Sequence, residues 1–266
     1  MDIIYGSPAQ VGIVQRAAAL HRLIGDDPRF TYQGRTVSLV GETPEAAGIV
    51  TDLVRLQGYS SVQFLPRAAS ARIQAHLAQA GLNPVEWEQF WGQDSALEAA
   101  RDFLAGYSPP DGLELCETDA DTDDDTIHRI CAMSQDQGVL TVPGSVMRGA
   151  GPRGVMMYVR APDGAVVAAG GGYMSYHPDS VRATEAFWGM LATAPDWRGK
   201  RLACWVGATV ILRLAERYGA RGFSSGVKAD NAASQAMCTR LGLIQSEFVY
   251  SGATDPAMLG DGPITR

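Results

Sequence analysis

The sequence predicts a mixed α/β fold in which helices cover a central sheet. Short strand-like runs alternate with helical runs, and glycines and prolines separate them. The chain has 266 residues, of which 46% are hydrophobic and 19% charged, the balance of a folded globular protein. Its formal charge of −7 argues against a protein bound to nucleic acid or to an anionic membrane surface, because both need clustered lysines and arginines.

The predicted elements fall into two domains. The segment GYSPPDG at 106–112 interrupts the pattern with prolines and glycines, so we place the boundary there and expect domains at 1–108 and 109–266. The strands expected in the second domain are 113–117, 155–160, 165–169, 186–193, 223–227 and 244–250. Its helices are expected at 124–136, 202–218 and 232–241. The GGG at 170–172 indicates a bulge or a closely packed site after a strand.

The cysteines and the first residues of the chain indicate the cellular environment of the protein. Four cysteines (Cys116, Cys131, Cys204 and Cys238) form no CxxC pair, so we expect reduced thiols and no metal site. The start lacks a signal-peptide pattern, and no run approaches the ~18 apolar residues of a transmembrane helix. We therefore expect a cytoplasmic protein with no membrane partner, whose oligomeric state stays open.

The strongest local pattern is the segment LATAPDWRGKRLA at 191–203. A strand there leads through a short basic loop directly into a long helix, which points free backbone N–H groups and the positive helix end at the loop. Arg198, Lys200 and Arg201 add three cations. The segment suits a phosphate or diphosphate, although a solvated surface loop would also fit the pattern.

These residues resemble the loop motif of the GNAT N-acetyltransferases, [QR]-x-x-G-x-[GA]. The matching residues are Arg198, Gly199, Lys200, Arg201, Leu202 and Ala203, with Arg201 in place of the central glycine. A second family signature, an Asn followed by a short helix that ends in Gly and an apolar residue, is matched from Asn231 to Leu243. The resemblance spans 113–250 and implies a GNAT fold preceded by an N-terminal α/β segment.

The resemblance implies acetyl-CoA as acyl donor and an amine of a small molecule or peptide as acceptor, with direct transfer. The pantetheine would lie against Leu191, Ala192 and Thr193, and the amides from Arg198 to Ala203 would hold the diphosphate. Asn231 would hydrogen-bond the pantetheine, a role compatible with a helix N-cap.

Catalytic residues are less clearly indicated. Glu185 lies near the start of the central strand and is the first candidate for general base, and His177 in the preceding loop is the second. Cys238 stands where the family commonly has a tyrosine acid, and it is either a proton donor or an inert buried thiol. Tyr176 and Tyr250 are possible substitutes for the acid.

Two other classes of function stay open, because three positions depart from the family pattern. These are Arg201, Cys238 and Phe187, the last at the position closest to a glutamate base that several family members have on this strand. One is a non-catalytic acyl-CoA-binding regulatory module. The other is an assembly partner in which the fold is only a scaffold.

The first half contains a segment whose predicted elements follow the same order as a segment of the second half. Residues 58–92 parallel 219–252, since both predict strand, loop, helix, Gly-Leu and strand. A strand at 36–40 and a helix at 44–57 would precede the first copy. This is either a degenerate half-GNAT repeat or a chance match. In either case 40–44 carries no Lys or Arg for a diphosphate, so we expect no second active site there.

Overall fold

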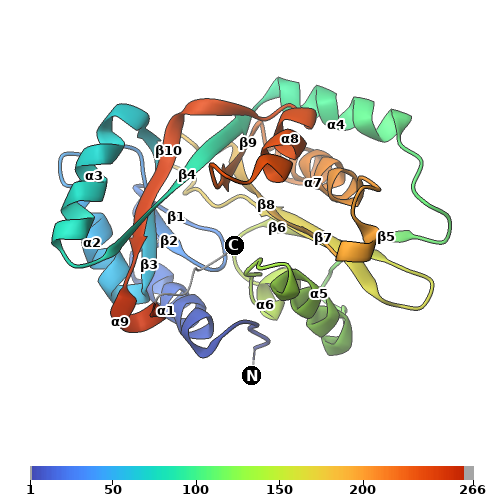
Figure 1. The fold of residues 1–266 in the computed structure, drawn as a ribbon, viewed down its shortest axis with the longest axis horizontal. Coiled ribbons are helices and arrows are strands. Elements are labelled where there is room, and N and C mark those ends of the chain that lie inside the picture. Colours follow the sequence, from blue (N-terminus) through green and yellow to red (C-terminus); the bar gives the residue numbers. More distant parts are fainter. Residues whose placement is uncertain (1, 261–266) are drawn as a thin grey trace.

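A single mixed sheet runs through the part of the chain that the computed structural model describes, residues 2–260 (Figure 1). Within these residues the sheet has 10 strands. In spatial order they are β1 (Phe30–Tyr32), β2 (Val37–Val40), β3 (Tyr59–Pro66), β10 (Ile244–Thr254), β4 (Asn83–Gly92), β9 (Gly222–Val227), β8 (Glu185–Thr193), β7 (Val166–Tyr173), β6 (Gly154–Arg160) and β5 (Glu114–Glu117).

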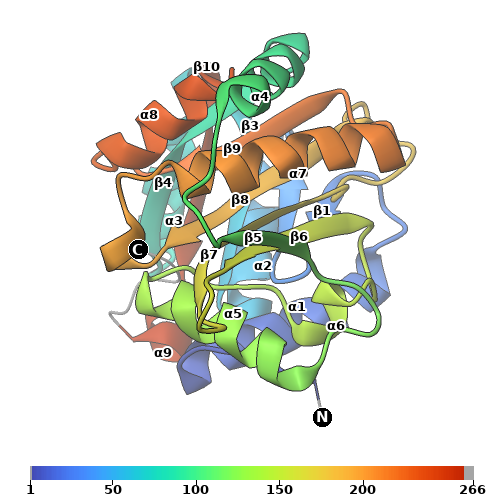
Figure 2. The ribbon, with the colours of Figure 1, turned by 90° about the vertical axis from the view of Figure 1, so that its right-hand side faces the viewer.

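Helices lie on both faces of this sheet (Figure 2). Their bounds are α1 (Pro8–Ile24), α2 (Ala46–Gln57), α3 (Arg67–Gln79), α4 (Asp94–Gly106), α5 (Asp124–Asp136), α6 (Gly144–Met147), α7 (Leu202–Tyr218), α8 (Ala232–Arg240) and α9 (Pro256–Leu259). In the second half α7 packs on one face of the strands, with α4 against it, and α5 covers the other face. No helix in residues 2–260 is both long and apolar enough to span a membrane.

The predicted elements of the second half are confirmed with small changes. The helices at 124–136 and 202–218 have the predicted bounds, because Asp123 caps the first and Gly219 ends the second in a left-handed conformation. The strand expected at 165–169 is longer and continues to Tyr173, so the GGG lies inside it. The last strand continues to Thr254, since it pairs with a neighbour on each side.

The three glycines of β7 permit close packing, as predicted. A Cβ on Gly170 would lie 2.3 Å from Cδ2 of Leu191, and one on Gly171 would lie 2.7 Å from the carbonyl oxygen of Val155. The register between β7 and β8 also shifts between the pairs of Ala169 and Gly171, which is the expected bulge. β7 thus lies close to its neighbours at the point where β8 bends.

The topology supports an internal repeat over a chance match. The helix α2 joins the parallel strands β2 and β3, as α7 joins the parallel strands β8 and β9. Each half then exchanges its last strand: β4 pairs with β9, β10 pairs with β3, and the two exchanged strands pair antiparallel at the centre. The two halves are therefore joined in one sheet, and the domain boundary near residue 108 stays a prediction.

Candidate functional site

The two central strands of the second half separate part-way along their length. β8 pairs with β9 in parallel from Glu185↔Gly222 to Phe187↔Ser224, and the pairing ends there. Met190 follows with a φ of 55°, a left-handed conformation that is uncommon for a non-glycine residue and bends the strand. The backbone edges beyond this point face a space in which an extended ligand could take the place of a strand.

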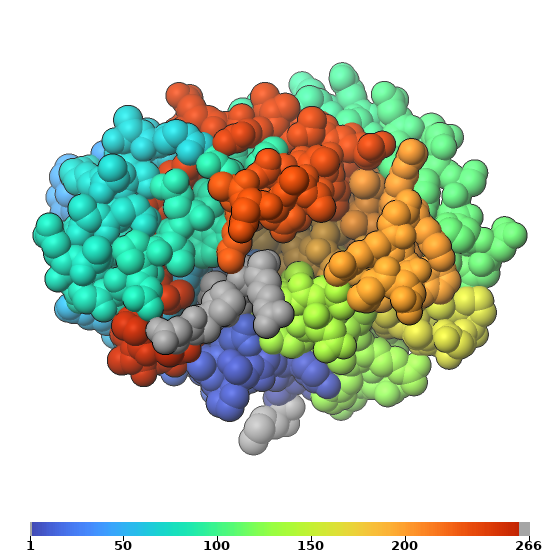
Figure 3. All heavy atoms as spheres, in the orientation of Figure 1, coloured from blue at the N-terminus to red at the C-terminus, as the bar shows by residue number. Residues whose placement is uncertain are grey.

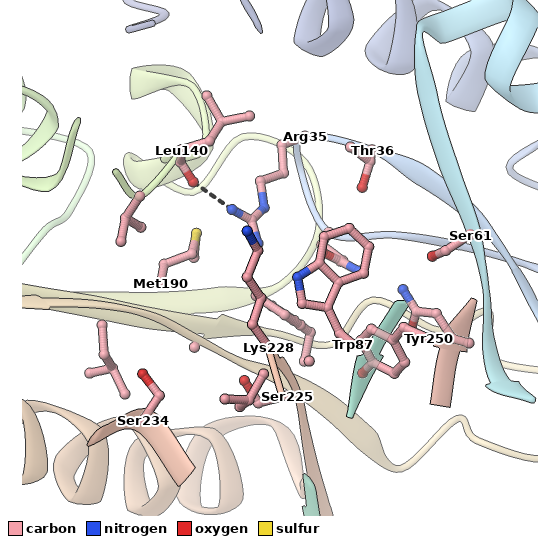
Figure 4. A pocket seen from close by; sticks show the side chains of 18 of the residues that line it. Arg35, Thr36, Ser61, Trp87, Leu140, Met190, Ser225, Lys228, Ser234 and Tyr250 are labelled. Atoms are coloured by element: carbon pink, nitrogen blue, oxygen red, sulfur yellow. Dashed lines mark hydrogen bonds between the residues drawn. The ribbon is translucent and has the colours of Figure 1, made fainter. Parts of the chain in front are cut away.

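A pocket fills that space and continues into the first half of the chain (Figure 4). Its volume is roughly 1060 Å³, counting the open mouth. The surface is hollowed between α8, the loop before α7 and the segment around residue 140 (Figure 3). The second half contributes Val139, Leu140, Phe187, Gly189, Met190, Leu191, Ser225, Gly226, Val227, Lys228, Asn231, Ser234, Met237, Cys238 and Tyr250. The first half contributes Gln33, Arg35, Thr36, Ser38, Tyr59, Ser61, Gln63 and Trp87.

The basic loop has the backbone of an anion-binding turn. Gly199 has a φ of 79°, and Arg201, the N-cap of α7, has φ 60° and ψ 23°. Arg201 therefore adopts the left-handed conformation that glycine adopts most easily, which explains how the family's glycine can be replaced without closing the turn. The first helical bond runs from the amide of Trp205 to the carbonyl of Arg201 at 3.0 Å, so the amides from Gly199 to Cys204 are available to a ligand. The amide of Arg198, expected to be among them, instead donates to the carbonyl of Pro195 at 3.1 Å.

Side chains around this loop hold its shape. Nζ of Lys200 lies 4.1 Å from the ring centroid of Trp197, and its carbonyl accepts a hydrogen bond of 2.8 Å from the hydroxyl of Tyr107. Arg198 donates to Oε1 of Gln137 at 2.7 Å. The side chain of Arg201 is exposed and forms no ion pair within residues 2–260. Of the three predicted cations, Arg201 is thus the one least engaged by the protein.

The first turn of α8 closes the other wall of the cleft. The side chain of Asn231 accepts a hydrogen bond of 3.1 Å from the amide of Ser234, which confirms its role as N-cap. Cys238, near the C-terminal end of α8, also lines the pocket and is only 1% exposed. Burial raises the pKa of its thiol to about 12, so the thiol is protonated at neutral pH and is a weak proton donor.

Residues 135–243 match the sequence model of the acetyltransferase (GNAT) family. This span contains the separating strands, the basic loop and α8. The chain contains a GNAT domain. The predicted resemblance is therefore correct over the region that carries both motifs.

Solved structures with the GNAT fold cover nearly the whole chain. A GCN5-related N-acetyltransferase from Kribbella flavida aligns over 92% of this chain and 95% of its own, with 14% identity and a TM-score of 0.58. A tandem GNAT protein from the clavulanic acid biosynthesis pathway aligns over 95% and 97%, with 13% identity and a TM-score of 0.53. A GCN5-related N-acetyltransferase-like protein from Streptococcus suis aligns over 91% and 100%, with 14% identity and a TM-score of 0.52.

At these identities the likeness shows the fold alone. It includes the first half as well as the GNAT domain, which agrees with an extended GNAT arrangement. No curated protein gives a significant match.

The predicted pantetheine strand of the GNAT domain is only partly open to the pocket. Leu191 lines it, whereas Ala192 is buried and pairs with Ala169 of β7. The carbonyl of Thr193 faces Nε of Arg198 at 3.4 Å. Leu202 is buried at the start of α7, and the neighbouring Ala203 is partly exposed there.

Glu185 lies at the start of β8 and does not line the pocket. Its carboxylate accepts hydrogen bonds from Arg182 at 2.7 Å and from the indole of Trp91 at 3.2 Å. Burial nevertheless raises the pKa of Glu185 above its usual value, which suits a group that must accept a proton.

Two buried tyrosines, Tyr176 and Tyr250, are influenced by the charge of Glu185. The hydroxyl of Tyr250, which lines the pocket, lies 3.2 Å from the hydroxyl of Ser224. Tyr176 donates to Oε1 of Gln63 at 3.0 Å. Burial raises the pKa of both tyrosines, and the charge of Glu185 contributes in the same direction. Glu185 is therefore electrostatically coupled to Tyr250 at the pocket wall and to Tyr176 behind Gln63.

His177 lies apart from this network. Its Nδ1 accepts a hydrogen bond of 3.1 Å from the amide of Asp179, and the ring does not line the pocket. The structure thus brings Cys238 and Tyr250 to the pocket, links Glu185 to it indirectly, and leaves His177 outside.

The sequence offered Trp87, Phe90 and Trp91 of the first half either as lining of a substrate pocket or as core residues, and of these three Trp87 lines the pocket. Trp87 is buried and packs edge-on against Tyr59 with 5.6 Å between ring centroids, and both rings also line the pocket. Arg35 lies between two short strands that carry no motif. Its position in a pocket more than a hundred residues from the GNAT motifs has no local signal in the sequence.

Proposed function

We propose that this protein is an N-acetyltransferase that moves an acetyl group from acetyl-CoA directly to an amine. One observation carries the proposal: the gap between β8 and β9 opens into a single pocket that continues among polar and aromatic side chains of the first half. The gap accommodates an extended cofactor arm, and the inner pocket accommodates an acceptor. A protein that only bound the cofactor would not need the inner pocket.

The cofactor's parts have matching partners on this chain. The open amides between Gly199 and Ala203, at the positive end of α7, suit a diphosphate. The free edge of β8 beyond Phe187 suits the amides of pantetheine, with Asn231 at the opposite wall. The thioester would then lie near the bend at Met190.

In the reaction the amine nitrogen forms a bond to the thioester carbonyl carbon, and the carbon–sulfur bond then breaks. The amine must first lose a proton, for which Glu185 is the proposed acceptor through water. The sulfur leaves as a thiolate or takes a proton from the pocket. Cys238 and Tyr250 are both poor donors, because burial raises the pKa of the Cys238 thiol to about 12 and raises the pKa of the Tyr250 hydroxyl as well, so solvent is the proposed source of this proton.

A non-catalytic acyl-CoA-binding role is the second candidate. It is favoured by the ion pair that holds the carboxylate of Glu185 outside the pocket lining. Calorimetry with acetyl-CoA followed by measurement of CoA release with a panel of amines separates the two. Binding without release from any amine would support the regulatory role, and absence of binding would exclude both.

The change Glu185→Gln tests the base. We expect kcat/KM to fall by about 10²-fold or more, the usual contribution of a general base, with acetyl-CoA affinity unchanged. In the unchanged protein the acid limb of the kcat/KM profile should lie above the usual pKa of a glutamate, because burial raises the pKa of Glu185. Glu216→Gln is the matched control, since that carboxylate pairs with Arg213 on the exposed surface of α7. Equal effects of the two substitutions would exclude Glu185 as the base.

A further inference from the structure

An arginine from the first half reaches the inner pocket. Arg35 lies between β1 and β2, and its side chain points into the pocket (Figure 4). Nη1 donates to the carbonyl oxygen of Leu140 at 2.5 Å, and Cζ lies 5.3 Å from the ring centroid of Phe187. Phe187 is also the last residue of β8 paired with β9. The guanidinium is therefore held next to the point where the cleft for the cofactor begins.

This cation has no anionic partner in the described chain. Arg35 forms no ion pair within residues 2–260, and the pocket lining contains no Asp or Glu. Burial lowers its pKa to about 10, which still leaves the group charged at neutral pH. A desolvated charge that is paired with one neutral carbonyl is unfavourable. The half-buried guanidinium of Arg35, which faces the pocket with one carbonyl and one ring as partners, therefore favours a ligand that brings a negative charge.

A second cation lies in the same pocket. Lys228 follows directly after β9, is partly buried and extends into the pocket on the side of Arg35 (Figure 4). It too has no ion pair within residues 2–260. The pocket thus collects two cations and no carboxylate in a chain whose net charge is −7. This local excess favours an anionic ligand.

We propose that the acceptor amine carries a carboxylate, which Arg35 binds. The inference rests on the proposed acetyltransferase function and names its substrate class. A guanidinium presents a planar fork of N–H groups that matches a carboxylate, and only one of its nitrogens is engaged by Leu140. The hydroxyls of Ser38 and Ser61 line the same pocket, and the rings of Tyr59 and Trp87 can pack against an apolar part.

The position of Arg35 narrows the class further. Because Phe187 contacts both the guanidinium and the start of the cleft, the carboxylate would bind close to the thioester. The amine that attacks the thioester must then lie near the carboxylate in the same molecule. A short distance between the amine and the carboxylate is a property of amino acids and their close relatives, and not of long polyamines or aminoglycosides.

Matched pairs of acceptors test the proposal. The pairs are an amino acid and its decarboxylated amine, namely tyrosine with tyramine and tryptophan with tryptamine. We expect kcat/KM to favour the amino acid of each pair by about 100-fold, the scale of a charge-assisted hydrogen-bonded pair. Preference for the decarboxylated amines, or for phosphoethanolamine over every carboxylate, would overturn the proposal.

Variants then assign the effect to Arg35. Arg35→Met should raise KM for the amino acids about 100-fold and leave the decarboxylated amines within about threefold. Arg35→Lys should restore part of the preference, because it keeps the charge without the fork. Arg101→Met, on the exposed surface of α4, is the matched control and should change neither. An equal loss on both members of each pair in Arg35→Met would refute a role in recognition.

A binding measurement separates this inference from the proposed function. Acetyl-CoA affinity is measured by calorimetry in every variant, and thermal stabilisation by the amino acids is measured without acetyl-CoA. If acetyl-CoA does not bind, the acetyltransferase proposal fails. Stabilisation by carboxylates that is lost in Arg35→Met would still support the anion site, and its absence in the unchanged protein would refute it.

Discussion

Replacement of Arg201 by glycine should stabilise the protein while it weakens cofactor binding. Arg201 occupies the left-handed region, with φ 60° and ψ 23°, and its side chain makes no capping hydrogen bond to α7. A residue with a side chain loses roughly 1–2 kcal/mol of folding stability in this conformation. Glycine avoids that loss but costs about 0.5–1 kcal/mol, because its unfolded chain has more conformational entropy to lose. The expected net gain is therefore about 0.5–1 kcal/mol, which corresponds to a Tm increase of roughly 1–4 °C for a chain of this size.

Arg201→Ala provides the comparison that isolates the backbone effect. Alanine removes the same charge and keeps a Cβ in the left-handed conformation, so the glycine variant should be the more stable of the two by about 1 kcal/mol. Urea unfolding followed by circular dichroism measures both. A glycine variant no more stable than the alanine variant would refute the strain at this position.

The same two variants test the contact with the diphosphate. If the exposed guanidinium reaches the phosphates, acetyl-CoA affinity should fall by up to about tenfold, equally in both variants, and the loss should shrink as salt rises. Calorimetry at two salt concentrations gives the result. Unchanged affinity in both would show that the backbone amides alone hold the diphosphate.

Two further predictions follow from packing and burial. Gly252→Ala would place a Cβ on β10 at 2.1 Å from the carbonyl oxygen of Ser60 in the neighbouring strand β3. Urea unfolding should therefore show a free energy of unfolding lower by about 2 kcal/mol or more. Gly48→Ala is the control, because its Cβ would meet no atom within 4 Å, and it should not lower the free energy of unfolding. Cys238 has a pKa raised to about 12, so in a Cys116→Ser background it should resist alkylation at pH 8, and Cys238→Ser should keep most of the activity; rapid labelling of Cys238 in the folded protein would contradict its burial.

The local parts of this protein could be predicted from the sequence. The helix 202–218 and the basic loop before it follow from hydrophobic period, glycine and charge within about twenty consecutive residues. The N-cap role of Asn231 likewise depends on the amide three positions away. These features are set by neighbours along the chain, which is why the family of the motif region was predicted correctly.

Only the tertiary structure brought residues of the first half into the pocket. Arg35 meets the carbonyl of Leu140 across 105 positions of sequence, and Trp91 reaches Glu185 across 94. The exchange of β4 and β10 brings such distant segments together, and strand pairing across that distance has no local pattern. Whether Arg201 could replace a glycine was equally undecided, because its φ depends on the packing of the whole turn against Tyr107 and α7. The sequence alone therefore determined the motifs, and long-range packing decided which charges face the pocket.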